Sequence, residues 1–500
     1  MSNTFLAGMK SAANYTRTEN GALTHKSTMD GLMDLFAMGA AYRTRTDEDV
    51  ILLFKNAFSE DPVYALKCLF YIRDVRGGQG ERRFFRVVTK WLASYNTDAM
   101  RRNLIHVPEF GRWDDLFVFI GTPLENDALS IVKHQLALDV QCKTPSLLGK
   151  WMPSENTSSQ KTRKIAAKVR KFIGMTPKQY RKTLSVLRAR INVLERLMSE
   201  GRWDEIEFDK IPSKAGLKYK NAFARHDIER MKRDPQVKSY ADFAKDTTTK
   251  VNAKALYPYE VVAKALRCQH RPMDDTDRLM VNKYWENLAD YFNGKSFNGL
   301  AVVDTSASMT WSGGEATPLN VAISLGLYCA ERAGGPFANH YVSFSRTPRL
   351  IETNGVDFVD KVYRIYRTNL CENTNIEATF DMLLNTALMN GCNQDDLPQN
   401  IIVISDMEFD AGCYGIRQSN AKTLMEGIRE KWARHGYRMP HLIYWNVQAR
   451  QDNVPEDMGC GLVSYVSGMS PSIFEQILSG KTGYDLMMEK LNSERYAVIG

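Results

Sequence analysis

The stretch GLAVVDTSASMTWSGG, residues 299–314, runs a short apolar segment directly into an aspartate, which is followed by two serines at alternate positions. An uninterrupted apolar run of this length is typical of a strand that is buried on both faces of a parallel sheet. Asp304, Ser306 and Ser308 would then follow the carboxyl end of that strand. The fold class depends on whether the chain continues with strands of the same kind.

Four further apolar runs follow, separated by blocks in which apolar residues recur at helical spacing. The runs are HYVSFS at 340–345, NIIVISD at 400–406, HLIYWNV at 441–447 and LVSYVS at 462–467. Alternating strands and helices predict a doubly wound α/β domain, which we place at residues 296–500. Ligands bind such domains at the carboxyl ends of the strands, beside a topological switch point.

The preceding part of the chain has a different pattern. From Met29 to about Glu286, apolar residues recur at helical spacing in short blocks that end at Pro or Gly. No fixed repeat length is visible, so any repeats have diverged from one another. Residues 1–295 are therefore predicted to form a helical domain of stacked hairpins.

Composition excludes several classes of protein. A chain of 500 residues with 44% apolar and 25% charged residues is typical of a globular protein with more than one domain. No apolar run approaches the length of a membrane span, and the N-terminus lacks an apolar leader, so we expect a cytoplasmic protein without membrane contact. The eight cysteines are scattered without metal-ligand spacing, which favours free thiols.

Charge is distributed unevenly along the chain. Residues 296–500 contain 16 Lys and Arg against 23 Asp and Glu, which leaves a balance of +15 on residues 1–295. Between Gln160 and Arg196, 12 basic residues accompany a single acid, Glu195. On a helical projection of 161–173, apolar residues occupy one side and cations the other. The cations are Lys161, Arg163, Lys164, Lys168, Arg170 and Lys171, and Arg181 and Lys182 follow them.

Such a face has two interpretations. Surface helices normally mix both signs of charge, and six cations repel one another unless an anion neutralises them, which favours nucleic acid. A solvated surface that only aids solubility is the alternative. The segment RDVRGGQGERRFFR also has two interpretations. Its glycines could let a phosphate approach a helix N-terminus beside Arg82 and Arg83, or they could form a tight turn between helices.

A second aspartate, Asp406, ends the run NIIVISD, and Thr374 lies in the loop before a predicted helix. Together with Asp304, Ser306 and Ser308 they make a set of oxygen donors without His or Cys, which suits Mg²⁺ or another divalent cation. Asp and Ser also cap helices and fill turns, so Asp-x-Ser-x-Ser alone is weak. A dehalogenase-type phosphotransferase would need a second Asp at Ser306, and no P-loop is present. No nucleophile can be paired with a base, so we expect no enzyme.

DTSAS at 304–308, Thr374 and SDMEF from Ser405 resemble the metal-ion-dependent adhesion site of von Willebrand factor A domains. The resemblance implies that Asp304, Ser306, Ser308, Thr374 and Asp406 hold Mg²⁺ directly or through water. It also implies a metal that is not catalytic and that keeps one position open for a partner's carboxylate.

RGGQGERRFFRVVTKWLASY at 76–95, GRWDDLF at 111–117 and ISDMEFDAG at 404–412 resemble the Ro ribonucleoprotein family. In that family a TROVE ring of HEAT-like helical repeats is closed by a von Willebrand domain. SLLGKWMPSENTSS at 146–159 and YRKTLSVLRARINVLE at 180–195 resemble more closely a set of uncharacterised Ro-like proteins of phages, bacteria and plants.

The Ro resemblance implies a noncatalytic, monomeric RNA-binding protein. Single-stranded or misfolded RNA would enter the basic ring, and small structured RNA would lie on its outside. The alternative is a protein-interaction adaptor that uses the metal site to capture a carboxylate of a partner.

Overall fold

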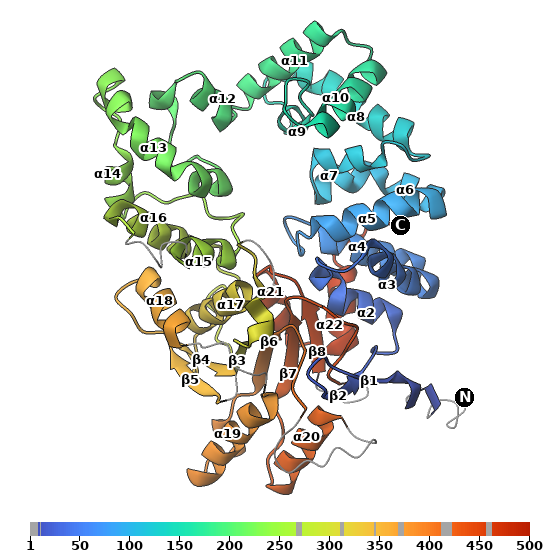
Figure 1. Ribbon diagram of the computed structural model, residues 1–500, viewed down its shortest axis with the longest axis vertical. Coiled ribbons are helices and arrows are strands. Elements are labelled where there is room, and N and C mark those ends of the chain that lie inside the picture. Colours follow the sequence, from blue (N-terminus) through green and yellow to red (C-terminus); the bar gives the residue numbers. More distant parts are fainter. Residues whose placement is uncertain are drawn as a thin grey trace. The chain divides into compact units, whose positions relative to one another are not determined.

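The computed structural model describes residues 9–10, 12–266, 273–310, 315–344, 347–368, 375–411, 423–456 and 463–500 (Figure 1). They group into two compact units. The sheet unit comprises residues 1–68 and 256–495, and the helical unit comprises residues 69–255 and 496–500. The sequence-based division at residue 295 and the closure of a ring both stay predictions.

The sheet unit is built on six strands in the order β5-β4-β3-β6-β7-β8. Their bounds are β3 Gly299–Asp304, β4 His340–Phe344, β5 Arg349–Glu352, β6 Asn400–Ser405, β7 His441–Asn446 and β8 Val463–Ser467. All neighbours are parallel except β5, which runs antiparallel to β4 at the edge. The five predicted strands are present. The sequence pattern missed β5 because this short edge strand is largely exposed and lacks an apolar run.

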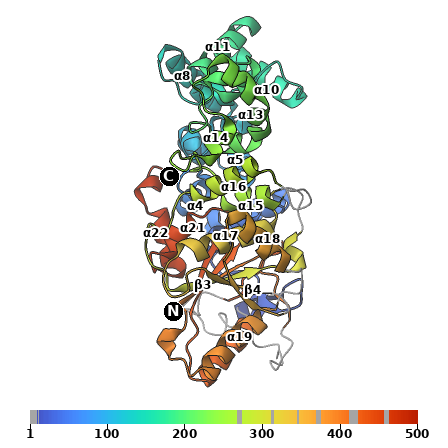
Figure 2. The same ribbon diagram turned by 90° about the vertical axis from the view of Figure 1, so that its left-hand side faces the viewer.

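Helices cover both faces of this sheet. On one side Trp445 of β7 contacts Phe474, with ring centroids 5.0 Å apart, and Phe474 stacks on Tyr328 of α17 at 5.5 Å. Figures 1 and 2 show α19 on the opposite side of the strands from α17. There Phe380 of α19 contacts Trp432 of α20 at 6.2 Å. The doubly wound arrangement is confirmed.

The α-helices of the sheet unit are α2 Gly31–Met38, α3 Asp47–Glu60, α15 Pro258–Leu266, α16 Asp275–Glu286, α17 Pro318–Arg332, α18 Phe358–Thr368, α19 Ile376–Met389, α20 Leu424–Arg434, α21 Ile473–Ile477 and α22 Gly483–Leu491. Its short 3₁₀ helices include η1 Gly39–Ala41, η5 Ala307–Thr310 and η6 Gln394–Asp396. Helix α17 starts where the sequence favours a start, because Thr317 accepts a hydrogen bond from the Asn320 amide at 3.1 Å and proline occupies the first turn.

A small N-terminal hairpin also belongs to the sheet unit. Strands β1 (Tyr15–Arg17) and β2 (Leu23–His25) pair in antiparallel fashion. Between them, the Thr18 hydroxyl donates to the carbonyl of Phe409 at 2.5 Å, which places the hairpin against the segment after β6. Three-residue strands leave too little pattern to be recognised, so the sequence analysis did not predict this element.

The helical unit is entirely helical in its regular structure, as the sequence predicts. Its elements are α4 Pro62–Arg73, which crosses the division between the units, α5 Arg82–Tyr95, α6 Thr97–Asn103, η2 Leu104–His106, α7 Val107–Phe110, η3 Trp113–Phe119, α8 Glu125–Gln141, α9 Leu148–Trp151, α10 Gln160–Ile173, α11 Pro177–Arg190, α12 Leu194–Ser199, η4 Trp203–Glu205, α13 Ser213–Arg233, α14 Tyr240–Lys245 and η8 Glu494–Tyr496. Phe70 forms edge-to-face contacts with Phe85 and Phe110, both at 5.3 Å, in its core. In the described ranges, no helix combines the length and the hydropathy that crossing a membrane requires.

His441 links three parallel strands of the sheet. Its Nδ1 lies 3.1 Å from Asn400 Oδ1 on β6, and its Nε2 lies 3.0 Å from Ser464 Oγ on β8. Burial lowers the pKa of His441 to about 4. The ring is therefore neutral in the folded protein at pH values where the unfolded chain, with a histidine pKa of about 6.5, already binds a proton.

We expect the stability of the sheet unit to fall as the pH drops from about 6.5 toward 4, because protonation of His441 favours the unfolded chain. This residue should contribute a loss of about 1–2 kcal/mol. Urea denaturation of wild type and His441→Gln at pH 7.5 and pH 5 measures it, with exposed His435→Gln as the control. An equal loss of stability in His441→Gln and wild type would contradict the assignment.

Candidate functional site

Two aspartates lie side by side at the carboxyl ends of two neighbouring central strands, a border of the sheet that we call the carboxyl edge. Strands β3 and β6 pair in parallel with Val303 opposite Ile404, so their carboxyl ends coincide. Asp304 ends β3 and Asp406 follows β6, and their side chains are 0% and 1% exposed. Because β4 and β6 lie on opposite sides of β3, this edge is the topological switch point of the sheet.

Hydroxyl groups surround Asp304. Its Oδ2 accepts a hydrogen bond from Ser405 Oγ at 2.6 Å, and its Oδ1 accepts one from the Ser306 amide at 2.9 Å. The hydroxyls of Ser306 and Ser308 are 2.9 Å apart. Four of the five predicted metal ligands are thus described at this edge, and Thr374 lies outside the described residues.

Asp406 is held by a strained backbone turn. Met407 has a φ of 66°, a left-handed conformation that residues other than glycine rarely adopt and that concentrates at functional sites. The turn lets the Glu408 amide donate to Asp406 Oδ1 at 3.2 Å. Asp406 Oδ2 lies 3.2 Å from Nη2 of Arg450 as an ion pair, but this buried oxygen accepts no hydrogen bond.

Burial disfavours the ionised form of the carboxyl groups at this edge. Burial, and then repulsion from Asp406, raises the pKa of Asp304 to about 7. Burial also raises the pKa of Asp406, although the positive charge of Arg450 opposes that shift. Burial likewise raises the pKa of Glu408 to about 7. A cation bound between the aspartates would relieve this repulsion.

Sequence reasoning missed several residues around this edge. Glu408 Oε1 accepts from Asn453 Nδ2 at 2.8 Å, and its Oε2 accepts from the Glu19 amide at 2.7 Å. Arg450 Nη1 pairs with Glu19 Oε2 at 2.6 Å. A signal existed for Arg450, because it follows β7 and therefore lies at the same carboxyl edge. None existed for Glu19, which the N-terminal hairpin supplies.

The side chains at this edge fit a hard divalent cation. The donors are carboxylate and hydroxyl oxygens, and Asp406 Oδ2 is a buried acceptor without a hydrogen bond. The described part of the chain contains no group of three or more His, Cys, Asp and Glu side chains suited to a metal. An ion here would depend on serine hydroxyls and water besides the two aspartates, which Mg²⁺ tolerates because it retains several waters.

Replacing Asp304 with Asn removes one of two carboxylates while nearly keeping the side chain's shape. We expect Mg²⁺ affinity to fall at least about tenfold in isothermal titration calorimetry. Arg450→Gln should bind Mg²⁺ more tightly than wild type, because it removes a competing positive charge from Asp406. Asp395→Asn, an exposed change on η6, is the control. Unchanged binding by Asp304→Asn would refute the site.

A second candidate site lies on the helical unit. Helix α10 is capped at its N-terminus by Ser159, whose hydroxyl accepts from the Thr162 amide at 3.2 Å, and is followed by Gly174 with a φ of 82°. Ala166 and Val169 are buried, as the helical projection predicts. We call its six cations the α10 basic face. They are Lys161, Arg163, Lys164, Lys168, Arg170 and Lys171, of which all but the half-buried Arg170 are exposed.

Tertiary contacts neutralise part of this face. Lys168 pairs with Glu125 of α8 at 2.6 Å, and Arg170 pairs with Glu155 at 2.6 Å. Glu155 also lies 3.6 Å from Arg181 of α11. The structure thus brings two acids to a face that the sequence shows as purely basic.

The other cations remain open to solvent. Arg163 donates to the Thr157 carbonyl at 3.3 Å. Lys161, Lys164, Lys171 and Lys182 are exposed and form no ion pair with any described acid. Two of these lysines open onto a hollow of about 470 Å³. The hollow is lined by Lys90, Phe117, Val118, Ile120, Gln160, Lys161, Lys164 and Ile165.

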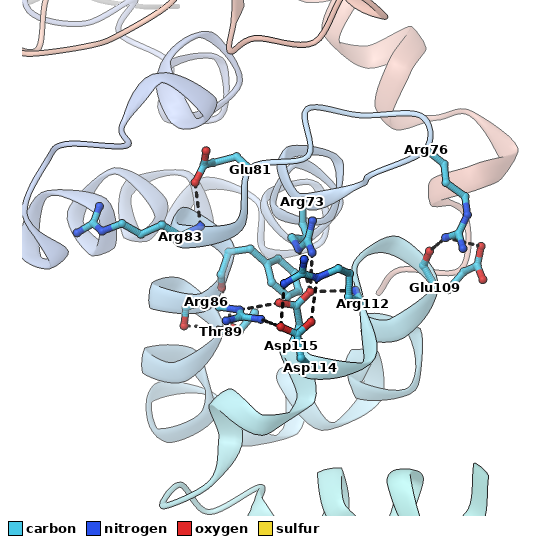
Figure 3. A network of polar contacts seen from close by, with 11 residues as sticks. Arg73, Arg76, Glu81, Arg83, Arg86, Thr89, Glu109, Arg112, Asp114 and Asp115 are labelled. Atoms are coloured by element: carbon cyan, nitrogen blue, oxygen red, sulfur yellow. Dashed lines mark hydrogen bonds and ion pairs between the residues drawn. The ribbon is translucent and has the colours of Figure 1, made fainter. Parts of the chain in front are cut away.

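A buried ion-pair network lies beneath the start of helix α5 (Figure 3). Asp115 is fully buried; its Oδ2 accepts from Arg73 Nη2 at 2.7 Å and its Oδ1 accepts from Arg86 Nε at 2.6 Å. Arg112 binds both oxygens of Asp114, at 2.9 and 2.8 Å. Arg73, Arg86 and Arg112 are therefore held in ion pairs within the protein.

Arg82 and Arg83 begin α5 after the glycine-rich turn. The amides of Gln79 and Gly80 donate to the Tyr71 and Asp74 carbonyls at 3.1 and 3.0 Å. The Glu81 carboxylate caps the helix by accepting from the Arg83 amide at 2.8 Å. This geometry favours the tight-turn interpretation over a phosphate cradle.

Arg82 remains exposed next to other cations. Partial burial, and then repulsion from neighbouring arginines, holds the pKa of Arg82 below its usual value. Figure 3 shows the Arg83 side chain directed away from the Asp114 and Asp115 network. A role for either arginine in RNA binding stays a prediction.

The excess positive charge is concentrated in the helical unit. Its residues include 37 Lys and Arg against 21 Asp and Glu, a balance of +16. The sheet unit has 29 against 37, a balance of −8. The helical unit is therefore the part of the chain suited to a polyanion.

The fold and these sites define a chain with a helical unit rich in basic residues and a doubly wound α/β sheet. Residues 18–145 and 124–296 match the family described as domain of unknown function (DUF2828), and this match covers more than half of the chain. The chain belongs to that family. Residues 298–496 match a second family, described as domain of unknown function (DUF7788).

A relative in Acanthamoeba polyphaga mimivirus, Uncharacterized protein L728, is 29% identical over 471 residues, which cover 87% of this chain and 79% of the relative. The crystal structure of the Deinococcus radiodurans RO (RSR) protein is similar with a TM-score of 0.44 and 14% identity. That comparison covers 94% of this chain and 100% of the other.

Proposed function

We propose that this protein binds RNA through its helical unit, in the manner of a Ro ribonucleoprotein. The observation that carries the proposal is the set of exposed, unpaired lysines on and beside the α10 basic face, within a unit whose net charge is +16. Lys161, Lys164 and Lys171 form no ion pair with any described acid, so their charges are available to phosphates. Releasing the counterions of a nucleic acid supplies the free energy of such contacts.

Single-stranded RNA fits this surface better than duplex. The hollow beside Lys161 and Lys164 also contains Phe117, so cations and an aromatic ring lie along one depression. Single-stranded nucleic acids bind where a basic groove follows the backbone and aromatic side chains accept the bases. Phosphate contacts fix a strand without reading its sequence, so we expect weak sequence preference.

We further propose that Asp304, Ser306, Ser308 and Asp406 hold Mg²⁺ or another divalent cation at the edge of the sheet, with Thr374 as the fifth candidate ligand. When bound, the ion would offer a coordination position to a carboxylate of a protein partner. Asp406 Oδ2, a buried acceptor without a hydrogen bond, supports this proposal.

The RNA proposal predicts a specific salt dependence. The triple variant Lys161→Glu, Lys164→Glu and Lys171→Glu should bind more weakly. Its slope of log affinity against log salt should be flatter by about 2 units, roughly 0.7 for each lost phosphate contact. Fluorescence anisotropy with a fluorescein-labelled 20-nucleotide oligouridylate, over a series of NaCl concentrations, measures both quantities.

A matched control separates local contacts from net charge. Lys26→Glu, Lys55→Glu and Lys481→Glu change the charge of the protein by the same amount at exposed positions of the sheet unit. This variant should keep the slope of wild type. Equal slopes for the two triple variants would mean that the α10 basic face is only solvated, and would favour the adaptor function instead.

A further inference from the structure

A cavity of the helical unit lies among α9, α11, α12 and the segment before α10. It has a volume of about 610 Å³, which is large enough for a nucleotide. Its lining includes Lys150, Trp151, Glu155, Arg181 and Arg196. Trp151 and Glu155 belong to SLLGKWMPSENTSS, a segment that the metal site and the α10 basic face do not explain.

Trp151 is held in place from outside the cavity. The guanidinium of Arg112 stacks on the indole, 4.0 Å from the ring centroid. Arg112 is itself fixed by two hydrogen bonds to Asp114, at 2.9 and 2.8 Å. The ion-pair network of Figure 3 therefore fixes the orientation of an aromatic ring that lines the cavity.

The cavity also contains an acceptor without a donor. Glu155 Oε1 accepts from Arg170 Nε at 2.6 Å. Its other oxygen, Oε2, is buried without a hydrogen bond and lies 3.6 Å from Arg181 Nη1. A buried carboxylate oxygen in this state favours a ligand that carries an N–H donor.

Cations outnumber acids around the cavity. Lys150, Arg181, Arg188 and Arg196 line it together with Glu155 and Glu195. Arg188 is fixed, because it donates to the Gly149 and Met152 carbonyls at 2.9 and 3.0 Å. A ligand that fits has an anionic part, a flat ring and N–H donors, which together describe a nucleotide.

We propose that this cavity binds one nucleotide of a single-stranded RNA. Its base would stack on Trp151 and donate an N–H to Glu155 Oε2, and its phosphate would lie near Arg181 and Lys150. The inference rests on the proposed RNA binding and adds to it a defined subsite. This subsite is distinct from the hollow beside the α10 basic face, because the two cavities share no lining residue.

The test compares Trp151→Leu, Trp151→Phe and Trp91→Leu. Stacking of one base on an aromatic side chain contributes to the free energy of binding. Trp151→Leu should therefore bind a fluorescein-labelled 10-nucleotide oligoadenylate roughly ten- to a hundredfold more weakly than wild type. Trp151→Phe keeps an aromatic ring and should stay within about fivefold of wild type. Trp91 stacks on Tyr95 of α5 and does not line the cavity, so Trp91→Leu should bind like wild type.

Tryptophan emission gives a second readout that a purely structural role would not change. Unlabelled oligoadenylate should quench the emission of wild type and of Trp91→Leu, and this quenching should be absent in Trp151→Leu. Circular dichroism confirms that each variant is folded.

Three results would overturn the proposal in distinguishable ways. If wild type binds the RNA and Trp151→Leu binds it equally well, the subsite is refuted and RNA binding stands. If Trp151→Leu and Trp151→Phe lose affinity equally and wild type shows no quenching that depends on Trp151, the residue is structural only. If wild type binds no RNA, the proposed function fails and the subsite fails with it.

Discussion

Fully buried carboxylates set the strictest constraint in this chain, because a charge removed from water must be paired or hydrogen-bonded. Asp115 meets this requirement with Arg73 and Arg86 at 2.7 and 2.6 Å. Removing one partner of such a group typically costs about 3–5 kcal/mol. Gly111 shows how closely the pair is packed, since a Cβ there would lie 2.4 Å from Asp115 Oδ2 and 3.0 Å from Arg73 Nε.

Asp304 is equally buried but is satisfied differently. Its donors are the hydroxyls of Ser405 and Ser306 and the Ser306 amide, and no described basic side chain pairs with it. Its neighbour Asp406 has one arginine, at 3.2 Å. The contrast with Asp115 is chemical: two arginines satisfy Asp115 with hydrogen bonds, whereas Asp304 has hydroxyl and amide donors and Asp406 Oδ2 is paired with Arg450 but accepts no hydrogen bond, which leaves capacity for a cation.

The same constraint links the buried network to the surface of the helical unit. Arg86 bonds to both Asp114 and Asp115, and Asp114 holds Arg112, which stacks on Trp151. A cavity residue is thus oriented by charges that are themselves held in the core. Because each contact restricts the next, the Trp151 ring has little freedom to reorient.

Local patterns determined the classes of structure. Uninterrupted apolar runs gave the five parallel strands, and strand ends placed Asp304 and Asp406 on one edge, because side-chain direction and strand polarity follow from the local sequence. Helical periodicity gave the two faces of α10. The edge strand β5 and the hairpin of β1 and β2 were too short to leave such a pattern.

Only the tertiary structure decided which charged groups have partners. Glu125 lies 43 residues from Lys168, and Glu19 lies more than 400 residues from Arg450, so no local pattern links them. Whether a cation is neutralised, whether a carboxylate is buried, and whether Trp151 meets Arg112 all depend on contacts between distant segments. Periodicity along the chain reports which face of an element is apolar, and folding alone determines what that face meets.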